Sequence, residues 1–155
     1  MTKKIINDYA ELLVKVGVNL QKKEKLVVSA PVLAADLVRV IVKSAYKHGA
    51  REVEVLWNDQ EVLKLGLKYR TEKNLSVVPD WAKAQRDAFI DEKICYIAIS
   101  SDDPEAMKNI SPKKLSASRR ARRKAFQKFS EYTSSNKIRW VLGAYPNKAW
   151  ATIVY

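Results

Sequence analysis

The stretch covering residues 25–57 constrains the fold more than any other, because its pattern of apolar residues changes period twice. Residues 26–28 form a short apolar run rich in β-branched side chains, which is typical of a strand buried on both faces. Residues 33–45 carry apolar side chains at helical spacing, and Gly49 follows where a helix needs a left-handed cap residue. In residues 53–57 the apolar side chains of Val53, Val55 and Trp57 then recur at every second position, which is typical of a strand. This order predicts two parallel strands joined by a right-handed crossover through a helix.

Strand and helix patterns keep alternating along the rest of the chain. The predicted fold class is therefore α/β, with a mainly parallel sheet of about four strands and helices on both faces. Further helices are expected over residues 5–16, 80–89, 112–132 and 146–150, and another is expected after Asn58, where Gly66 weakens it. Asn58 and Asp80 are the expected N-caps of their helices. Further strands are expected over residues 94–100 and 137–144, and residues 71–79 are expected to be a connection without regular structure.

The chain of 155 residues is long enough for one domain with a buried core. Cys95 is the single cysteine and lies in an apolar run, so we expect a buried thiol without a disulfide. No run approaches the roughly 20 apolar residues of a membrane span, and no signal peptide is recognisable. We therefore expect a cytoplasmic protein with no membrane partner. The apolar ending at residues 153–155 predicts that residues 1–155 are one domain of a longer, truncated chain.

A net charge of +12 indicates attraction to polyanions, so a basic nucleic-acid-binding α/β module is the alternative function. The positive charge is densest in the expected helix over residues 112–132, where Arg120, Arg123, Lys124 and Lys128 share one face. Aromatic side chains are not interleaved with these residues, although proteins that bind single strands prefer such a pattern. A solvated basic surface is therefore favoured, and a nucleic-acid partner is not.

Arg122 is the exception on this basic helix, because it projects within the apolar stripe between Leu115 and Phe129. Its side chain can extend past the edge of the core, pair with a carboxylate or reach a partner surface. A structural ion pair is favoured over a functional contact, because a buried arginine normally requires pairing.

Ligands of open α/β sheets bind at the carboxyl ends of the strands, so the strand-to-helix loops are the places to search for a site. Residues 29–32 contain no glycine and no basic residue, which argues against a phosphate-binding loop. A flavodoxin-like nucleotide or cofactor module is a further hypothesis, but only the fold class suggests it, and a fold class does not imply a function. Asp102, Asp103 and Glu105 suit a divalent metal or a general base, but a cap at Asp103 on a following helix is favoured.

Other catalytic arrangements lack essential residues. His48 is the single histidine and precedes the expected cap glycine, where a cationic side chain suits the end of a helix. A zinc site built from His48 and a buried Cys95 is not favoured, and no Ser–His–acid set can be assembled. The sequence therefore predicts no catalytic or metal-binding residue in this chain, and it identifies no substrate-binding residue.

A family pattern is carried by residues 9–21, 26–31, 45–50, 53–55, 57–59, 98–104, 140–142 and 149–151. Taken in this order, these segments resemble the start of the thermophilic-type metalloaminopeptidases, the group of aminopeptidase T, aminopeptidase S and PepS. The resemblance runs along essentially the whole chain without large gaps. No single segment is a catalytic signature, but the combination is specific.

The resemblance implies a cytosolic homodimeric exopeptidase that removes N-terminal residues from peptide substrates. Two divalent metal ions (zinc, cobalt or manganese) would activate the water molecule that attacks the peptide bond. The metal ligands of this family are glutamates, histidines and an aspartate in the C-terminal part of a chain more than twice this length, so no ligand can be assigned within residues 1–155. We therefore expect the N-terminal, non-catalytic domain of such an enzyme. It would be inactive alone, and its partner would be the missing C-terminal domain.

Overall fold

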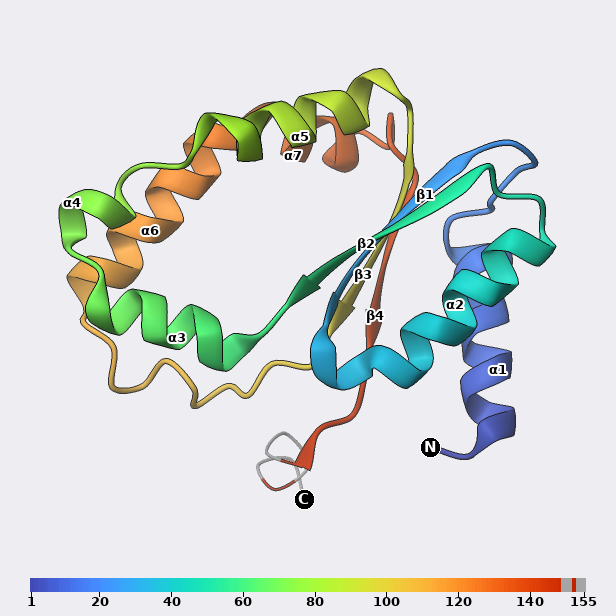
Figure 1. Ribbon diagram of the computed structural model, residues 1–155, viewed down its shortest axis with the longest axis horizontal. Helices are drawn as coiled ribbons and strands as arrows, with labels where there is room; N and C mark the ends of the chain where they lie inside the picture. The colour runs from blue at the N-terminus through green and yellow to red at the C-terminus, as the bar shows by residue number, and fades with distance from the viewer. Residues whose placement is uncertain (149–151, 153–155) are drawn as a thin grey trace.

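A four-stranded, all-parallel sheet lies at the centre of the computed structural model, which describes residues 1–148 and residue 152 (Figure 1). Its strand order is β2-β1-β3-β4, and helices lie on both sides, which confirms the predicted α/β fold class. All four carboxyl ends meet at one edge of the sheet because the strands are parallel. The strands are β1 (Lys25–Pro31), β2 (Glu52–Asn58), β3 (Cys95–Ser100) and β4 (Trp140–Ala144).

The first face of the sheet is covered by α1 (Lys3–Leu12) and α2 (Ala35–Lys47), which form the larger core with β1 and β3. Gly49 follows α2 with φ +89°, so the predicted left-handed cap is confirmed. A short 3-10 turn, Val32–Ala34, joins β1 to α2, and a π-helical turn, Leu13–Gly17, extends α1. The buried apolar residues that carry this core are Leu13, Val14, Val18, Leu26, Val28, Leu37, Val38, Ile41, Ile97 and Ile99.

The π-helical turn changes which residues of the first helical segment are buried. Val16 would share a face with Leu13 at α-helical spacing, but it is 71% exposed, and Val14 is buried instead. A π turn has more residues per turn than an α-helix, so it shifts the buried face by about one position. Gly17 still ends this segment, and its Cα lies so close to Val141 that an added Cβ would come within 2.9 Å of that side chain.

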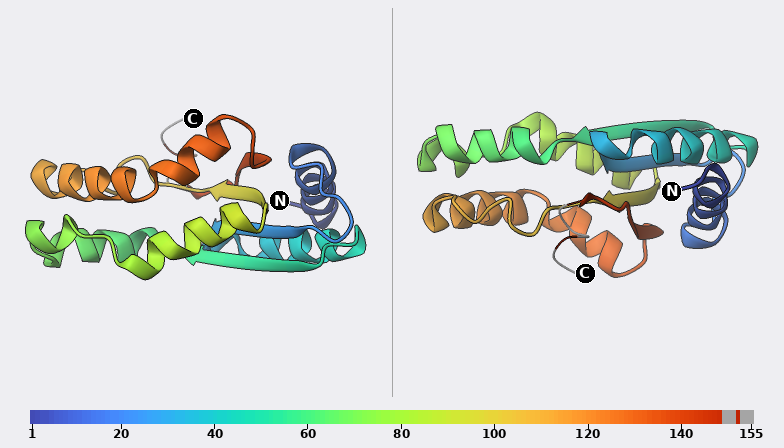
Figure 2. Two further views of the ribbon diagram at one scale, coloured as in Figure 1. Left: turned by 90° about the horizontal axis from the view of Figure 1, so that it is seen from above. Right: turned by 90° about the horizontal axis from the view of Figure 1, so that it is seen from below.

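The second face is covered by two layers of helices that extend to one side of the sheet (Figure 2). Phe89 and Ile90 of α5 and Phe129 of α7 pack on Val27 of β1 and form the smaller core. The helix α4 lies against α6 farther from the sheet. The first layer contains α3 (Gln60–Tyr69), α4 (Glu72–Leu75) and α5 (Asp80–Asp91), and the second contains α6 (Pro112–Ala125) and α7 (Gln127–Ser134).

Several expected element boundaries are wrong on this second face. The helix expected over residues 112–132 is two helices separated at Phe126, where φ is −105° and ψ is 14°. The expected connection over residues 71–79 contains α4, whose N-cap Thr71 accepts a hydrogen bond from the Asn74 amide. Neither change is marked by a proline or a glycine, so tertiary packing decides both.

Two predicted helix caps also move. Asn58 is the last residue of β2, and Asp59 caps α3 instead: its Oδ1 accepts from the Glu61 and Val62 amides at 2.9 and 3.2 Å. The helix then continues through Gly66 to its end at Tyr69. Asp80 is not a cap but the first residue of α5, because Pro79 takes the N-cap position. These shifts are of one residue and leave the predicted helices themselves in place.

The C-terminal helix expected over residues 146–150 is tested only at its start. Pro146 and Asn147 are not helical, Lys148 is, and residues 149 and 150 lie outside the described part of the chain, as does the apolar ending at residues 153–155. None of the helices in the described part of the chain is long and apolar enough to cross a membrane.

Candidate functional site

The carboxyl edge of the sheet is the position at which this fold can hold a ligand. The connection from β1 to β2 crosses one face of the sheet through α2, whereas the connection from β3 to β4 crosses the other face through α7. The chain therefore leaves β1 and β3 in opposite directions, which makes the gap above their carboxyl ends the switch point of the sheet. Ligands of open α/β sheets bind at such a point.

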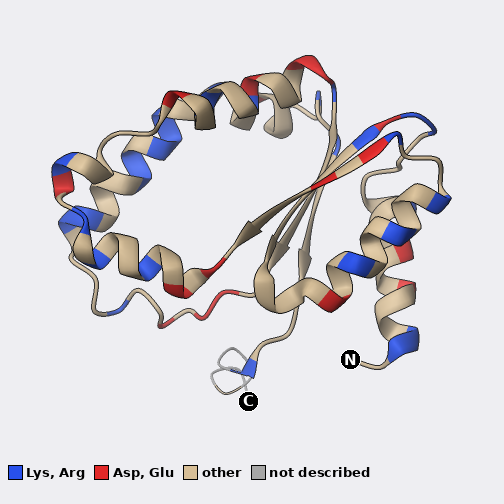
Figure 3. Cartoon of the chain, viewed as in Figure 1, with Lys and Arg blue, Asp and Glu red and all other residues tan. Residues whose placement is uncertain are grey.

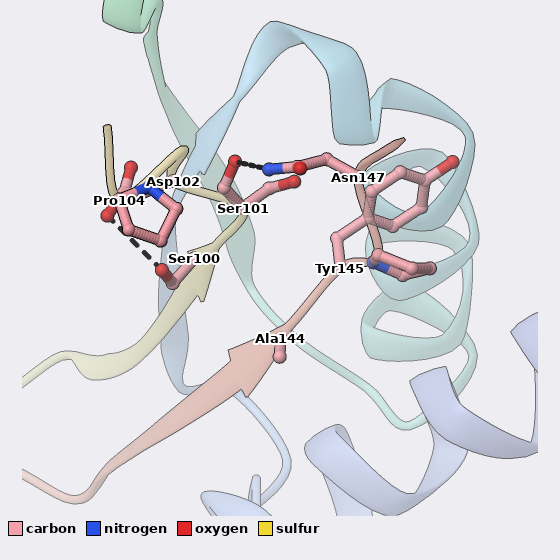
Figure 4. A pocket seen from close by; sticks show the side chains of 8 residues that line it. Ser100, Ser101, Asp102, Pro104, Ala144, Tyr145 and Asn147 are labelled. Atoms are coloured by element: carbon pink, nitrogen blue, oxygen red, sulfur yellow. Dashed lines mark hydrogen bonds between the residues drawn. The ribbon is translucent and has the colours of Figure 1, made fainter. Parts of the chain in front are cut away.

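Two neighbouring depressions lie at this edge, and we call them together the carboxyl-edge site. The first, of about 440 Å³, lies between the ends of β3 and β4 (Figure 4). The second, of about 320 Å³, lies over the ends of β1, β2 and β3. Ser101, Asp102 and Asn147 line both of them. The first also includes Ser100, Ala144 and Tyr145, and the second includes Pro31, Asp59, Gln60, Glu61 and Asp103.

The loop after β3 is held in place by Gln60 of α3. The Gln60 Oε1 accepts from the Asp103 amide at 3.0 Å, and its Nε2 donates to the Asp103 carbonyl at 3.2 Å. Asp103 in turn accepts from the Glu105 amide at 2.9 Å. The helix cap predicted at Asp103 is therefore wrong: Asp103 closes a turn over residues 104–109, and the next helix, α6, begins only at Pro112 with Ser111 as its cap.

Polar groups from β3 and β4 face each other across the first depression. Ser100 donates to the Asp102 carboxylate at 3.3 Å, and Asn147 donates its side-chain N–H to the Ser101 carbonyl. Tyr145 donates its hydroxyl to Asp36 at 3.0 Å; burial and this contact raise the pKa of Tyr145. The Ser101 hydroxyl is different, because it is out of solvent and has no hydrogen-bond partner among the described residues.

The charge of the carboxyl-edge site is opposite to that of the whole chain. Four of the residues that line it are carboxylates, namely Asp59, Glu61, Asp102 and Asp103, and none of its described lining residues is Lys or Arg. Figure 3 shows these acidic positions grouped at the start of α3 and in the loop after β3. A protein with a net charge of +12 thus keeps an acidic patch at this edge.

The described residues do not fit a metal ion. No three side chains of His, Cys, Asp or Glu in that part of the chain converge on a point that could hold one. His48 lies at the end of α2, where its Nδ1 is 2.7 Å from the Ser44 carbonyl and its Nε2 is 3.9 Å from Glu11. The structure therefore separates His48 from the acidic loop at Asp102 and Asp103, and we derive no metal-dependent step from residues 1–148.

Cys95 is buried at the start of β3, as predicted. Arg139 donates to its Sγ at 3.2 Å, and the thiol lies 3.4 Å from a Glu24 carboxylate oxygen. Burial and the nearby Glu24 charge raise the pKa of Cys95 to about 12. Such a thiol is not a nucleophile at neutral pH, because only the thiolate reacts.

The basic residues of α6 form an exposed surface, and Arg119, Arg120, Arg123 and Lys124 all face solvent. The ion pair predicted for Arg122 is not formed among the described residues. Arg122 is exposed, and its guanidinium lies 5.2 Å from the centre of the Phe126 ring. Phe126 lies four residues after Arg122, so this contact is local to the end of α6.

Arg86 of α5 is the cation that does lie among aromatic rings. Its guanidinium is 5.7, 5.2 and 5.5 Å from the centres of Phe89, Phe126 and Phe129. Burial, together with the nearby charge of Arg122, lowers the pKa of Arg86. Sequence reasoning missed this contact, because α5 and α7 are far apart along the chain.

Comparison with known proteins assigns this chain to a protein family. The chain matches the thermophilic metalloprotease (M29) family over residues 2–155, and it belongs to that family. The resemblance drawn from residues 9–21 onward is thereby confirmed.

The relatives that it matches are aminopeptidases. Aminopeptidase AmpS of Bacillus subtilis is 35% identical over 150 residues, and aminopeptidase PepS of Streptococcus thermophilus is 33% identical over 153. These matches cover 97% and 99% of this chain but only 37% of each relative. The solved structure of wild-type AmpT from Thermus thermophilus has a TM-score of 0.91 at 28% identity, and the match covers 99% of this chain and 38% of that one. This chain corresponds to the N-terminal part of these proteins.

Proposed function

We propose that residues 1–155 form the N-terminal, non-catalytic domain of a cytoplasmic aminopeptidase. The parent enzyme releases N-terminal residues from peptides with two divalent metal ions, zinc, cobalt or manganese, and acts as a homodimer. The domain holds no metal ligand and is inactive alone. Its role is to shape access to the catalytic cavity and the arrangement of subunits, while a C-terminal domain performs the chemistry.

The observation that carries this proposal is the pattern of coverage. Nearly the whole chain matches the relatives, yet it spans only about 37% of their length. The remaining part of each relative is large enough to be a further domain. Because no described residues fit a metal ion, that further domain is the place where we expect the ligands.

Exposed apolar side chains on the first helical layer support a covering domain. Val62, Leu65 and Tyr69 share one face of α3 and are 64%, 53% and 74% exposed. Trp81, at the start of α5, is 71% exposed. Large exposed apolar groups of this kind mark surfaces that contact another protein or domain. We assign them to contact with the C-terminal domain of the parent, since more than half of each relative's chain lies outside the matched part and could form such a domain.

A chimera tests the role of the domain. The matched N-terminal part of aminopeptidase T from Thermus thermophilus is replaced by residues 1–155, and hydrolysis of leucine nitroanilide is measured with added metal. We expect the chimera to retain activity, because the two folds superpose closely. The control is the same enzyme with its N-terminal part deleted, which should lose activity. A folded but inactive chimera would contradict the proposed equivalence of the two domains.

The isolated chain tests the location of chemistry. Residues 1–155 alone are incubated with aminoacyl nitroanilides and with zinc, cobalt or manganese, and we expect no release of nitroaniline above that of metal and buffer. Metal-dependent hydrolysis that co-purifies with the chain and disappears on unfolding would place the site within these residues and overturn the proposal.

A further inference from the structure

We propose that the carboxyl-edge site binds a cationic amine or guanidinium group carried on an apolar stem. Such a group occurs at the N-terminus of a peptide and on the side chains of Lys and Arg, and the choice of a peptide as one source rests on the proposed function. The site is formed by the ends of β1, β3 and β4 and by the start of α3. The proposal combines an unpartnered hydroxyl, a local excess of negative charge and an apolar wall.

The unpartnered hydroxyl belongs to Ser101. The residue is 8% exposed and lines both depressions, and its Oγ has no hydrogen-bond partner among the described residues. Figure 4 shows its side chain between Asp102 on one side and Asn147 on the other. A buried hydroxyl without a hydrogen-bond partner destabilises the folded state, and such groups are rare in native structures. A ligand that donates a hydrogen bond at this position would satisfy it.

The charge of the site selects a cation. Asp59, Glu61, Asp102 and Asp103 line it, whereas Lys and Arg are missing from its described lining. Asp59 and Asp103 already accept hydrogen bonds from backbone amides, and Asp102 accepts one from Ser100 on Oδ2. The Oδ1 of Asp102, the residue next to Ser101 in the chain, has no hydrogen-bond partner among the described residues and is free to accept from a cation. Hydrogen bonds to an ionised group are about twice as strong as neutral ones.

The shape of the site favours an organic cation over a bare metal ion. The carboxylates do not converge as the ligands of a divalent ion would among the described residues. The depression between β3 and β4, of about 440 Å³, is walled mainly by Pro104, Ala144, Pro146 and the Tyr145 ring. This volume and these walls suit the alkyl stem of an amine, with its charged head directed to Ser101 and Asp102.

Titration of residues 1–155 followed by amide NMR tests the proposal with three probes. L-leucinamide represents a peptide N-terminus, Nα-acetyl-lysine methylamide represents a basic side chain, and N-acetyl-leucinamide is the neutral control. We expect a cationic probe to shift the amides of Ser101, Asp102 and Asn147, and we expect the neutral control to leave them unchanged. A response to leucinamide alone indicates a peptide N-terminus, and a response to the lysine derivative alone indicates a basic side chain of a protein.

Matched variants locate the contact. Asp102→Asn should weaken binding of the responding probe by about tenfold or more, because it removes the charge that the cation faces. Ser101→Ala should weaken it several-fold while leaving the fold intact. Asp91→Asn is the control: it makes the same change in charge at the exposed end of α5, at the opposite edge of the sheet, and should leave binding unchanged.

Two results would overturn the proposal: no shift with either cation, or equal shifts with the neutral probe. Equal weakening by Asp91→Asn and Asp102→Asn would also overturn it, since binding would then follow net charge alone. These results are independent of the chimera and hydrolysis experiments, because they measure binding to the isolated domain. Failure of the binding site therefore leaves the proposed aminopeptidase domain standing, and the reverse also holds.

Discussion

Among single residues, Lys25 is a buried charge that several carboxylates neutralise. Lys25 at the start of β1 is only 8% exposed, and its Nζ lies 3.5, 3.2 and 3.3 Å from carboxylate oxygens of Glu52, Glu54 and Glu92. Burial by itself lowers the pKa of Lys25, but the hydrogen bonds to Glu54 and Glu92 and the surrounding negative charge outweigh it, so the pKa is raised.

We expect Lys25→Met to lower the free energy of unfolding by about 2 kcal/mol at pH 7, because three carboxylates would lose their common cation. A raised pKa means that this stabilisation is complete below the ordinary value of 10.5 and is lost as the pH rises through the raised value. Urea unfolding at pH 7 and above pH 11 measures both effects. Lys83→Met is the control, because its exposed ion pair with Asp87 should contribute less than about 1 kcal/mol. An equal loss in both variants would contradict the argument.

Cys95 should resist thiol–disulfide exchange with an added reagent while the domain is folded. A rise of its pKa from 9.0 to about 12 leaves about 10³-fold less thiolate at pH 8, and burial blocks the reagent as well. Reaction with Ellman's reagent is followed at 412 nm with and without guanidinium chloride. We expect a full equivalent of thiol to react only after unfolding, and rapid reaction of the native chain would show that β3 opens readily at its start.

Whole elements show which patterns in the sequence were informative. The periods of 2 and 3.6 predicted all four strands and the middle parts of α1, α2 and α5, because each pattern is local in the sequence. The last strand, β4, begins at Trp140 and not at residue 137 as expected. The break at Phe126, the π turn at Leu13–Gly17 and the helix at Glu72–Leu75 were not predicted. Each of these follows from packing against an element that is distant in sequence, and local period carries no signal for it.

A pair of variants tests the corrected cap of α3. Asp59→Ala should lower the free energy of unfolding by about 1 kcal/mol, because the Glu61 and Val62 amides would lose their acceptor. Asn58→Ala, at the cap position expected from sequence, should change it by less than about 0.5 kcal/mol. Urea unfolding of both variants decides between the two positions. A larger effect at Asn58 would restore the cap expected from sequence.

The molecule as a whole should not be equally stable everywhere. The strand β1 lies between β2 and β3 and is almost completely buried, whereas α3 has no buried residue. Segments with few buried contacts open locally at a lower free energy than the global transition. The first helical layer and the sheet are thus expected to differ in cooperativity within one domain.

Hydrogen exchange measures this difference directly. We expect amides of α3 to exchange at least about 10²-fold faster than those of β1, because α3 can open without exposing the core. The interior strand β3 is the internal control and should match β1. Equal protection of α3 and β1 would show that the helical layer unfolds only together with the sheet.

The candidate site was predictable only in part. Asp102, Asp103 and the carboxyl edge were singled out from sequence, because polar residues directly follow a recognisable buried strand. Gln60, Ser101 and Asn147 were missed. The hydrogen bonds between Gln60 and Asp103 and between Asn147 and Ser101 each join segments more than 40 residues apart, so no local pattern marks them.

The sequence by itself determined the α/β class, the buried Cys95 and membership of the thermophilic metalloprotease family, since these depend on local period and on the identity of short segments. The tertiary structure alone decided which loops meet at the carboxyl edge, which rings of the later helices Arg86 contacts and which apolar faces stay open. The physical reason is that strand order and crossover direction bring distant residues together, and no single segment of the sequence specifies either of them.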